Sequence, residues 1–200
     1  MIDKELGSQM LDAHGRGASV LAVALAEKLL NDGSENGWVL ETYAANLIEL
    51  GRCTDAEAVL DRAEKVSKKE RLPWLIHRRA LLEEHRGNYA VALELWKSAN
   101  AMAPDEATFL IYAASIAFRL GNLMEAEELA RMGTRCAEGC PDEAWHNLGR
   151  YLAAQKRYDE ALFCHEKAIE IDPEYKIAIA LRDELLQVLD IASGKNAADE

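Results

Sequence analysis

The sequence has little proline and no recognisable strand pattern. Only four of its 200 residues are proline, and the strict alternation of apolar and polar residues that marks a half-buried strand is hard to find. Alanine, leucine and glutamate are abundant instead, and all three favour helix. The sequence therefore predicts an all-α fold, with a chain long enough for one or two domains and a sizeable core.

An excess of positive charge and a long apolar segment are also missing. Lys and Arg number 23 against 35 Asp and Glu, a net charge of −12, which argues against general binding to nucleic acid or anionic membranes. The apolar run at residues 18–26 has nine residues, well short of the ~20 that span a membrane. It continues as an amphipathic helix, and the acidic N-terminus differs from a secretory signal. We expect no nucleic-acid and no membrane partner.

The four cysteines do not form a recognisable disulfide framework. Cys53, Cys136, Cys140 and Cys164 are scattered, which favours a reduced, cytoplasmic setting. Cys136 and Cys140 form a C-x₃-C pair within the spacing range of some zinc sites, with His146 six residues on. Because no second cysteine pair accompanies them, an incidental loop pair is the favoured interpretation, with a redox or metal role as the alternative.

Motifs for catalysis are absent as well. The sequence contains no phosphate-binding or dinucleotide-binding glycine loop, no G-x-S-x-G elbow and no H-E-x-x-H helix. Neighbouring carboxylates such as Glu127 and Glu128 fall on helices whose other face is apolar, so we expect them to be solvated. The sequence therefore predicts a protein that is not an enzyme and has no catalytic residue, cofactor or metal.

What the sequence does contain is an internal repeat. With Asp142 as position 1, Trp145, Leu148 and Gly149 fall at positions 4, 7 and 8, on one face of a helix. Small residues at positions 8 and 20 let a second helix approach closely, and Pro173 ends the unit. The same pattern starts at residues 3, 37, 73, 107 and 142, with spacings of 34, 36, 34 and 35 residues.

This pattern closely resembles the tetratricopeptide repeat (TPR) family in its "W..LG..Y" start, the small residues at positions 8 and 20, and the closing proline. The resemblance implies an α-solenoid of stacked antiparallel helix hairpins, a right-handed superhelix, over residues 3–175. We expect units at 3–36 (degenerate, a repeat or an N-terminal cap), 37–70, 73–106, 107–140 and 142–175, a C-terminal capping helix at 174–192 and a disordered tail at 193–200. His165 departs from the family's aromatic preference, and a core histidine is the favoured interpretation.

The capping helix has an apolar stripe and a polar exterior. Its predicted inner stripe is Ile177, Leu181, Leu185 and Val188 or Leu189, and its predicted exterior is Asp183, Glu184 and Asp190. Such a helix can cover the last hairpin, whose outer face would otherwise be bare.

The first helix of each unit has a face opposite its core. At ~100° per residue, positions 2, 5, 6, 9, 12 and 13 lie there, and we expect their side chains to be exposed. The resemblance implies that these faces line the concave side of the superhelix, where TPR proteins hold a peptide or partner helix. The predicted partner-binding groove consists of Trp38, Trp74, His77, Arg78, His85, Ile111, Tyr112, Phe118, Arg119, His146, Asn147 and Arg150.

This composition is typical of an interaction surface. Exposed aromatic residues together with arginine are enriched in binding hot spots. We expect the three arginines to attract acidic groups of a partner and the aromatic side chains to bury its apolar ones. Alternatively, some of the aromatic residues are covered by neighbouring loops or by the first hairpin.

The predicted function is non-catalytic binding of a partner's peptide or helix, as a scaffold or adaptor. One alternative is a bacterial secretion-type TPR chaperone that holds an aggregation-prone client, and a second is a homodimer that buries the aromatic face. TPR proteins that grip the Hsp70/Hsp90 C-terminal tail resemble one another in a set of Lys, Asn and Arg positions. Here those positions hold residues such as Glu41, Ala45 and Thr108, so we do not expect that tail as a partner.

Overall fold

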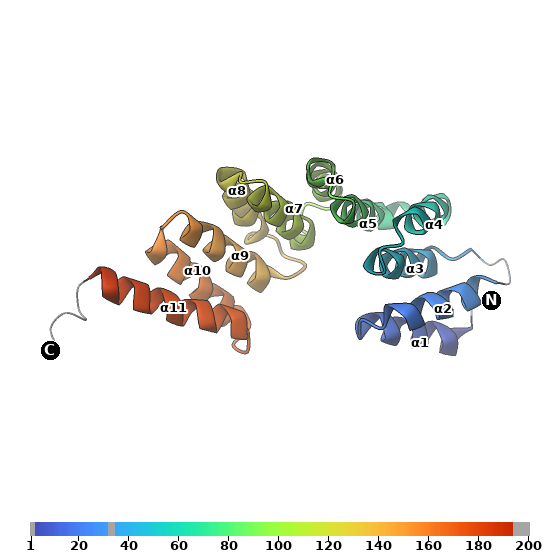
Figure 1. Ribbon diagram of the computed structural model, residues 1–200, viewed down its shortest axis with the longest axis horizontal. Coiled ribbons are helices and arrows are strands. Elements are labelled where there is room, and N and C mark those ends of the chain that lie inside the picture. The colour runs from blue at the N-terminus through green and yellow to red at the C-terminus, as the bar shows by residue number, and fades with distance from the viewer. Residues whose placement is uncertain (1–2, 32–34, 194–200) are drawn as a thin grey trace. The chain divides into compact units, whose positions relative to one another are not determined.

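The computed structural model describes residues 3–31 and 35–193 and confirms the all-α solenoid fold. These residues form eleven α-helices and one short 3₁₀ helix, and their only β-type contact is an isolated bridge between Glu106 and Glu138. The chain divides into two compact units, unit 1 at residues 1–102 and unit 2 at residues 103–200, which are described separately (Figure 1).

Unit 1 consists of three helix hairpins. Its helices are α1 (Lys4–Gly15), α2 (Ser19–Leu30), α3 (Gly37–Glu49), α4 (Cys53–Val66), η1 (Lys69–Arg71), α5 (Leu72–His85) and α6 (Tyr89–Met102). The Asp3 side chain accepts hydrogen bonds from the first turn of α1, and Asn36 caps α3 in the same way. Gly51 and Gly87 have φ values of 70° and 81° where first helices turn into second helices, a conformation that glycine adopts without strain.

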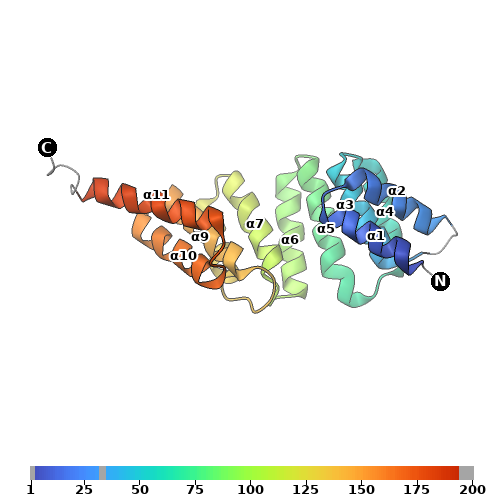
Figure 2. The same cartoon turned by 90° about the horizontal axis from the view of Figure 1, so that it is seen from below.

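The hairpins of unit 1 pack on one another, and small residues lie where the two helices of one hairpin meet. The second helix α2 packs against α3, and α4 packs against α5 (Figures 1 and 2). The alanines at positions 8 and 20 of the pattern, Ala44 and Ala56 in one hairpin and Ala80 and Ala92 in the next, are all fully buried. Leucines such as Leu40 fill the space around them, and each buried leucine contributes roughly 1.5–3 kcal/mol.

Unit 2 consists of two hairpins and a final helix. Its helices are α7 (Ala107–Arg119), α8 (Leu123–Gly133), α9 (Pro141–Ala154), α10 (Tyr158–Ile171) and α11 (Lys176–Ala192). The segment between α8 and α9 is tied to the start of α7, because Ala107 N–H donates to the Glu138 carbonyl (3.1 Å) and Glu138 N–H donates to the Asp105 carbonyl (3.0 Å). These bonds hold the C-x₃-C segment against unit 2.

The final helix α11 packs against α10, and its inner stripe differs from the prediction at Ile177. Ile177 is 59% exposed and Ala178 is buried in its place, while Leu185 is buried as predicted. The cause is that the face of α11 in contact with α10 begins one residue later than the hydrophobicity pattern indicates. Residues 194–200 of the predicted tail lie outside the described residues. No described helix is both long and apolar enough to cross a membrane.

Candidate functional site

The predicted groove residues are not all exposed. The four residues at position 5, namely Glu41, His77, Ile111 and His146, have exposed fractions of only 3–6%, and Asn147 has 6%. The prediction that these residues face solvent is wrong. A first helix such as α3 contacts its own second helix, the second helix of the preceding hairpin and neighbouring first helices, so more of its circumference is covered than a two-helix hairpin would cover.

His77 is a packing residue that joins α5 to α6. Trp96 on α6 is fully buried, and its Nε1–H donates to His77 Nδ1 at 2.9 Å. Burial, together with the neighbouring charge of Arg78, lowers the pKa of His77 to about 3. His77 is therefore a neutral hydrogen-bond acceptor inside unit 1 rather than a contact for a partner.

His146 occupies the same place in the last hairpin, where it meets His165 of α10. Their ring centroids are 5.2 Å apart, and Tyr175 lies 5.1 Å from His146 on the same measure. His165 is 1% exposed, which confirms the core interpretation. A Cβ atom on Gly149 would lie 2.9 Å from the His165 ring, so the glycine at position 8 makes room for it. The Nδ1 atoms of both histidines are buried and have no hydrogen-bond partner among the described residues.

The two histidines predict a loss of stability in acid. Burial, assisted by nearby positive charge, lowers the pKa of His146 and of His165 from 6.5 to about 4. Between pH 6.5 and about 4 the unfolded chain therefore binds protons that the folded chain does not. We expect the free energy of unfolding to fall as the pH falls through this window, in urea titrations followed by circular dichroism. In the variant His165→Phe the fall should be shallower, and an unchanged slope would contradict this assignment.

Several other predicted groove residues are accessible to different degrees. Trp38 and Trp74 are partly buried, and the Trp38 ring packs on α1, since a Cβ on Gly7 would lie 3.0 Å from its Cη2. The first hairpin therefore covers part of Trp38, as the alternative interpretation held. Arg78 and Tyr112 are partly buried, and His85 and Arg119 are exposed.

A cavity of about 360 Å³ in unit 2 brings two predicted residues together with several unpredicted ones. Phe118 on α7 and Arg150 on α9 are the two residues that were predicted to contact a partner. Residues of α10 and α11 complete the lining. We call this the unit-2 cavity, and its lining residues are Phe118, Arg150, Ala153, Tyr158, His165, Leu181, Glu184, Leu185 and Val188. The sequence analysis missed the contribution of α11 because the apolar stripe of that helix was assigned to capping alone.

Phe118 is held in place by the core. Its ring stacks on Tyr151, with centroids 4.8 Å apart and planes inclined by 27°. Tyr151 is 1% exposed, and burial raises the pKa of its hydroxyl to about 12. The cavity thus presents a fixed aromatic surface, and an apolar group that packs against it costs little ordering of the protein.

Arg150 has no carboxylate partner in the described part of the structure, a property that it shares with Arg135, whereas most arginines of the chain form ion pairs. The Nη1–H of Arg150 donates a hydrogen bond to Asn147 Oδ1 at 3.3 Å, and Arg150 is exposed to solvent. Ion-paired arginines are Arg16, Arg52, Arg62, Arg71, Arg79, Arg86, Arg131, Arg157 and Arg182. Arg150 thus places an exposed guanidinium beside a mostly apolar cavity. Because this guanidinium has no carboxylate partner among the described residues, it can bind the carboxylate of another molecule.

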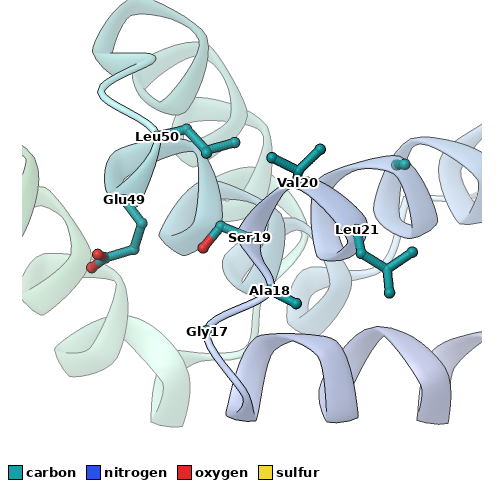
Figure 3. A pocket seen from close by; sticks show the side chains of 8 residues that line it. Gly17, Ala18, Ser19, Val20, Leu21, Glu49 and Leu50 are labelled. Atoms are coloured by element: carbon teal, nitrogen blue, oxygen red, sulfur yellow. The ribbon is translucent and has the colours of Figure 1, made fainter.

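Another hollow, of about 730 Å³, lies in unit 1 where the α1–α2 turn meets the end of α3. Val20 and Leu50 lie near each other at its rim, and the Glu49 carboxylate points away from them (Figure 3). Val20 is 71% exposed, so the hollow is open to solvent. It contains none of the predicted groove residues.

Nothing in the described part of the chain supports a metal or redox site at Cys136 and Cys140. All four cysteines are free, and the described residues contain no group of three or more metal-binding side chains. Burial, followed by nearby acidic residues, raises the pKa of both thiols, so the reactive thiolate is disfavoured.

Comparison with known proteins agrees with this architecture. Sequence models described as "Tetratricopeptide repeat" match residues 77–141 and 142–175. Tetratricopeptide repeat protein 7A of Homo sapiens is 30% identical over 98 residues, 49% of this chain and 11% of its own length. Protein bimA of Emericella nidulans is 23% identical over 150 residues, 72% of this chain and 18% of its own. The chain therefore spans less than a fifth of the length of either relative.

Solved structures resemble the chain over most of its length. A thermophilic TPR protein of Thermus thermophilus has a TM-score of 0.71 at 19% identity, covering 92% of this chain and 98% of its own. A tetratricopeptide repeat protein from Parabacteroides merdae has a TM-score of 0.72 at 19% identity, covering 90% and 70%. At this identity the likeness shows the fold alone.

Proposed function

Because the chain belongs to the tetratricopeptide repeat family, whose fold serves protein–protein interaction, we propose that its unit-2 cavity binds a short segment of another protein. An apolar side chain of the partner packs against Phe118 and the apolar residues of α11, and an acidic group pairs with Arg150. The role of the protein in this proposal is that of a scaffold or adaptor, without catalysis.

One observation carries the proposal: an arginine without a carboxylate partner stands at a cavity whose lining is mostly apolar. Most other arginines pair with acidic residues of the chain, for example Arg79 with Asp61 and Glu64, and Arg135, which does not, lies away from this cavity. A guanidinium beside apolar surface has the composition of a binding hot spot, where arginine and aromatic residues are enriched. The volume of about 360 Å³ suits one or two inserted side chains rather than a whole helix.

A protein of similar fold supports this choice of ligand. YrrB, described as a TPR protein with an unusual peptide-binding site, has a TM-score of 0.58 at 16% identity and covers 87% of this chain. The residues of the proposed site come from this chain alone.

The proposal predicts that Arg150 selects acidic peptides. Random peptides displayed on phage, selected against the full chain, should be enriched in Asp or Glu near a bulky apolar residue. Affinities of synthetic copies can be measured by fluorescence anisotropy. The substitution Arg150→Glu replaces attraction of the acidic peptide by repulsion and should lower the peptide affinity about tenfold. Changing the acidic residue of the peptide to Lys should restore binding to this variant.

Arg135→Glu is the matched control. Arg135 is also exposed and also belongs to unit 2, and its replacement by Glu changes the net charge by the same amount. Arg135 does not line the unit-2 cavity. It should leave peptide affinity unchanged. Equal losses in Arg135→Glu and Arg150→Glu would show a general charge effect and overturn the assignment of Arg150.

The remaining accessible groove residues stay proposed contacts with a partner, separately in unit 1 and in unit 2. They are Trp38, Trp74, Arg78, His85, Tyr112 and Arg119. The secretion-chaperone alternative requires that the chain keep an insoluble client in solution, and the homodimer alternative requires twice the monomer mass in light scattering. Peptide selection at the unit-2 cavity distinguishes both alternatives from the proposed function, because neither requires enrichment of an acidic motif.

A further inference from the structure

The final helix α11 contributes more than a cap to unit 2. Leu181, Leu185 and Val188 line the unit-2 cavity from the side of α11, and so does Glu184. Of the 17 residues of α11 only Ala178 and Leu185 are buried. Among the residues of α11 that line the cavity, Leu181 and Val188 are partly buried and Glu184 is exposed, so these three are accessible to a bound molecule.

Glu184 shares with Arg150 the lack of a charged partner. Glu184 is exposed to solvent, and no described residue forms an ion pair or hydrogen bond with the Glu184 carboxylate. The neighbouring Asp183 is different, since Arg182 pairs with it at 2.7 Å. The cavity is therefore lined by one positive and one negative group, on the separate helices α9 and α11, with Tyr158, His165 and apolar side chains as the rest of its lining.

We propose that Glu184 makes α11 part of the binding site, and that the bound segment carries a bulky apolar residue between an acid for Arg150 and a base for Glu184. This inference rests on the proposed function and narrows the partner to segments with both charges. Two groups of opposite sign without partners are complementary to such a segment, whereas a purely acidic segment would leave an acid facing Glu184. Complementarity of this kind adds selectivity more than affinity.

Parallel phage selections test the inference, with random peptides as the probe and the full chain as the target. Peptides selected on the native chain should carry Lys or Arg on one side of the apolar residue and Asp or Glu on the other. Selection on Glu184→Lys should replace the base by an acid. A synthetic peptide that was selected on the native chain should bind the Glu184→Lys variant about fivefold more weakly than the native chain. Changing the basic residue of this peptide to Glu should restore its affinity for the variant.

Asp190→Lys is the matched control, because Asp190 is exposed on the same helix and does not line the cavity. It should select the same peptides as the native chain. If Glu184→Lys also selects those peptides, the inference is overturned while the role of Arg150 stands. If the native chain selects no peptide motif, both the inference and the proposed function are overturned.

Discussion

Replacing Trp96 by Ala is expected to unfold much of unit 1. Trp96 is fully buried, and truncating such a side chain costs roughly 3–5 kcal/mol. The change also leaves the buried Nδ1 of His77 without its donor, which adds about 1–3 kcal/mol. The sum approaches the total stability of a typical domain. Hydrogen exchange followed by mass spectrometry should show that α5 and α6 lose protection, whereas α9 and α10 keep theirs.

Two further variants separate the causes. Trp96→Phe keeps most of the apolar volume but removes the donor, so its cost should be about 1–3 kcal/mol. Val91→Ala truncates an apolar residue of the same helix that is 51% exposed, and it should change protection little. If Trp96→Ala behaved like Val91→Ala, the Trp96–His77 pair would not hold the hairpin, and His77 would again be a candidate for the groove.

Replacing Phe118 by Ala is expected to remove most of the peptide affinity of the unit-2 cavity. The ring is partly exposed and is held against Tyr151, so it can serve as a rigid anchor for an apolar side chain. Truncating a hot-spot aromatic costs about 2 kcal/mol or more, which corresponds to a loss of roughly thirtyfold. The affinity of a selected peptide for this variant, measured by fluorescence anisotropy, provides the test.

Leu120→Ala is the control for this prediction. Leu120 lies two residues further on, is 42% exposed and does not line the cavity, so its truncation should leave peptide binding unchanged. Because Phe118 also packs on the core, the urea midpoint of Phe118→Ala must be measured alongside. An unchanged affinity in the folded variant would exclude the cavity as the binding site.

The sequence was sufficient to predict the fold because the repeat pattern encodes local packing. Gly149 illustrates this: a small residue at position 8 is needed because the second helix passes so closely that a Cβ would meet the His165 ring. A small residue recurs at position 8 as Ala44, Ala80 and Ala114 in the three preceding hairpins, so the constraint is visible in a single sequence. The all-α prediction followed from the same regularity.

The exposure of the predicted groove could be derived from the sequence only in part. Helical geometry places position 5 away from the core of its own hairpin, but the side chains there reach the second helix of that hairpin, as the contacts of His77 with Trp96 and of His146 with His165 show. That burial depends on contacts between helices, which the period of one helix does not contain. The contribution of α11 to the unit-2 cavity depends in the same way on how the last helix packs against α10.

Chemical-shift mapping tests the central claim most directly. A peptide selected on the native chain is titrated into the isotopically labelled full chain, and the backbone amide shifts are followed by NMR. We predict that the largest changes occur at Phe118, Arg150, Ala153 and Leu185, and that Arg150→Glu suppresses them. Changes confined to α3 and α5 of unit 1, with α9 and α11 unaffected, would contradict the claim that the unit-2 cavity binds the partner.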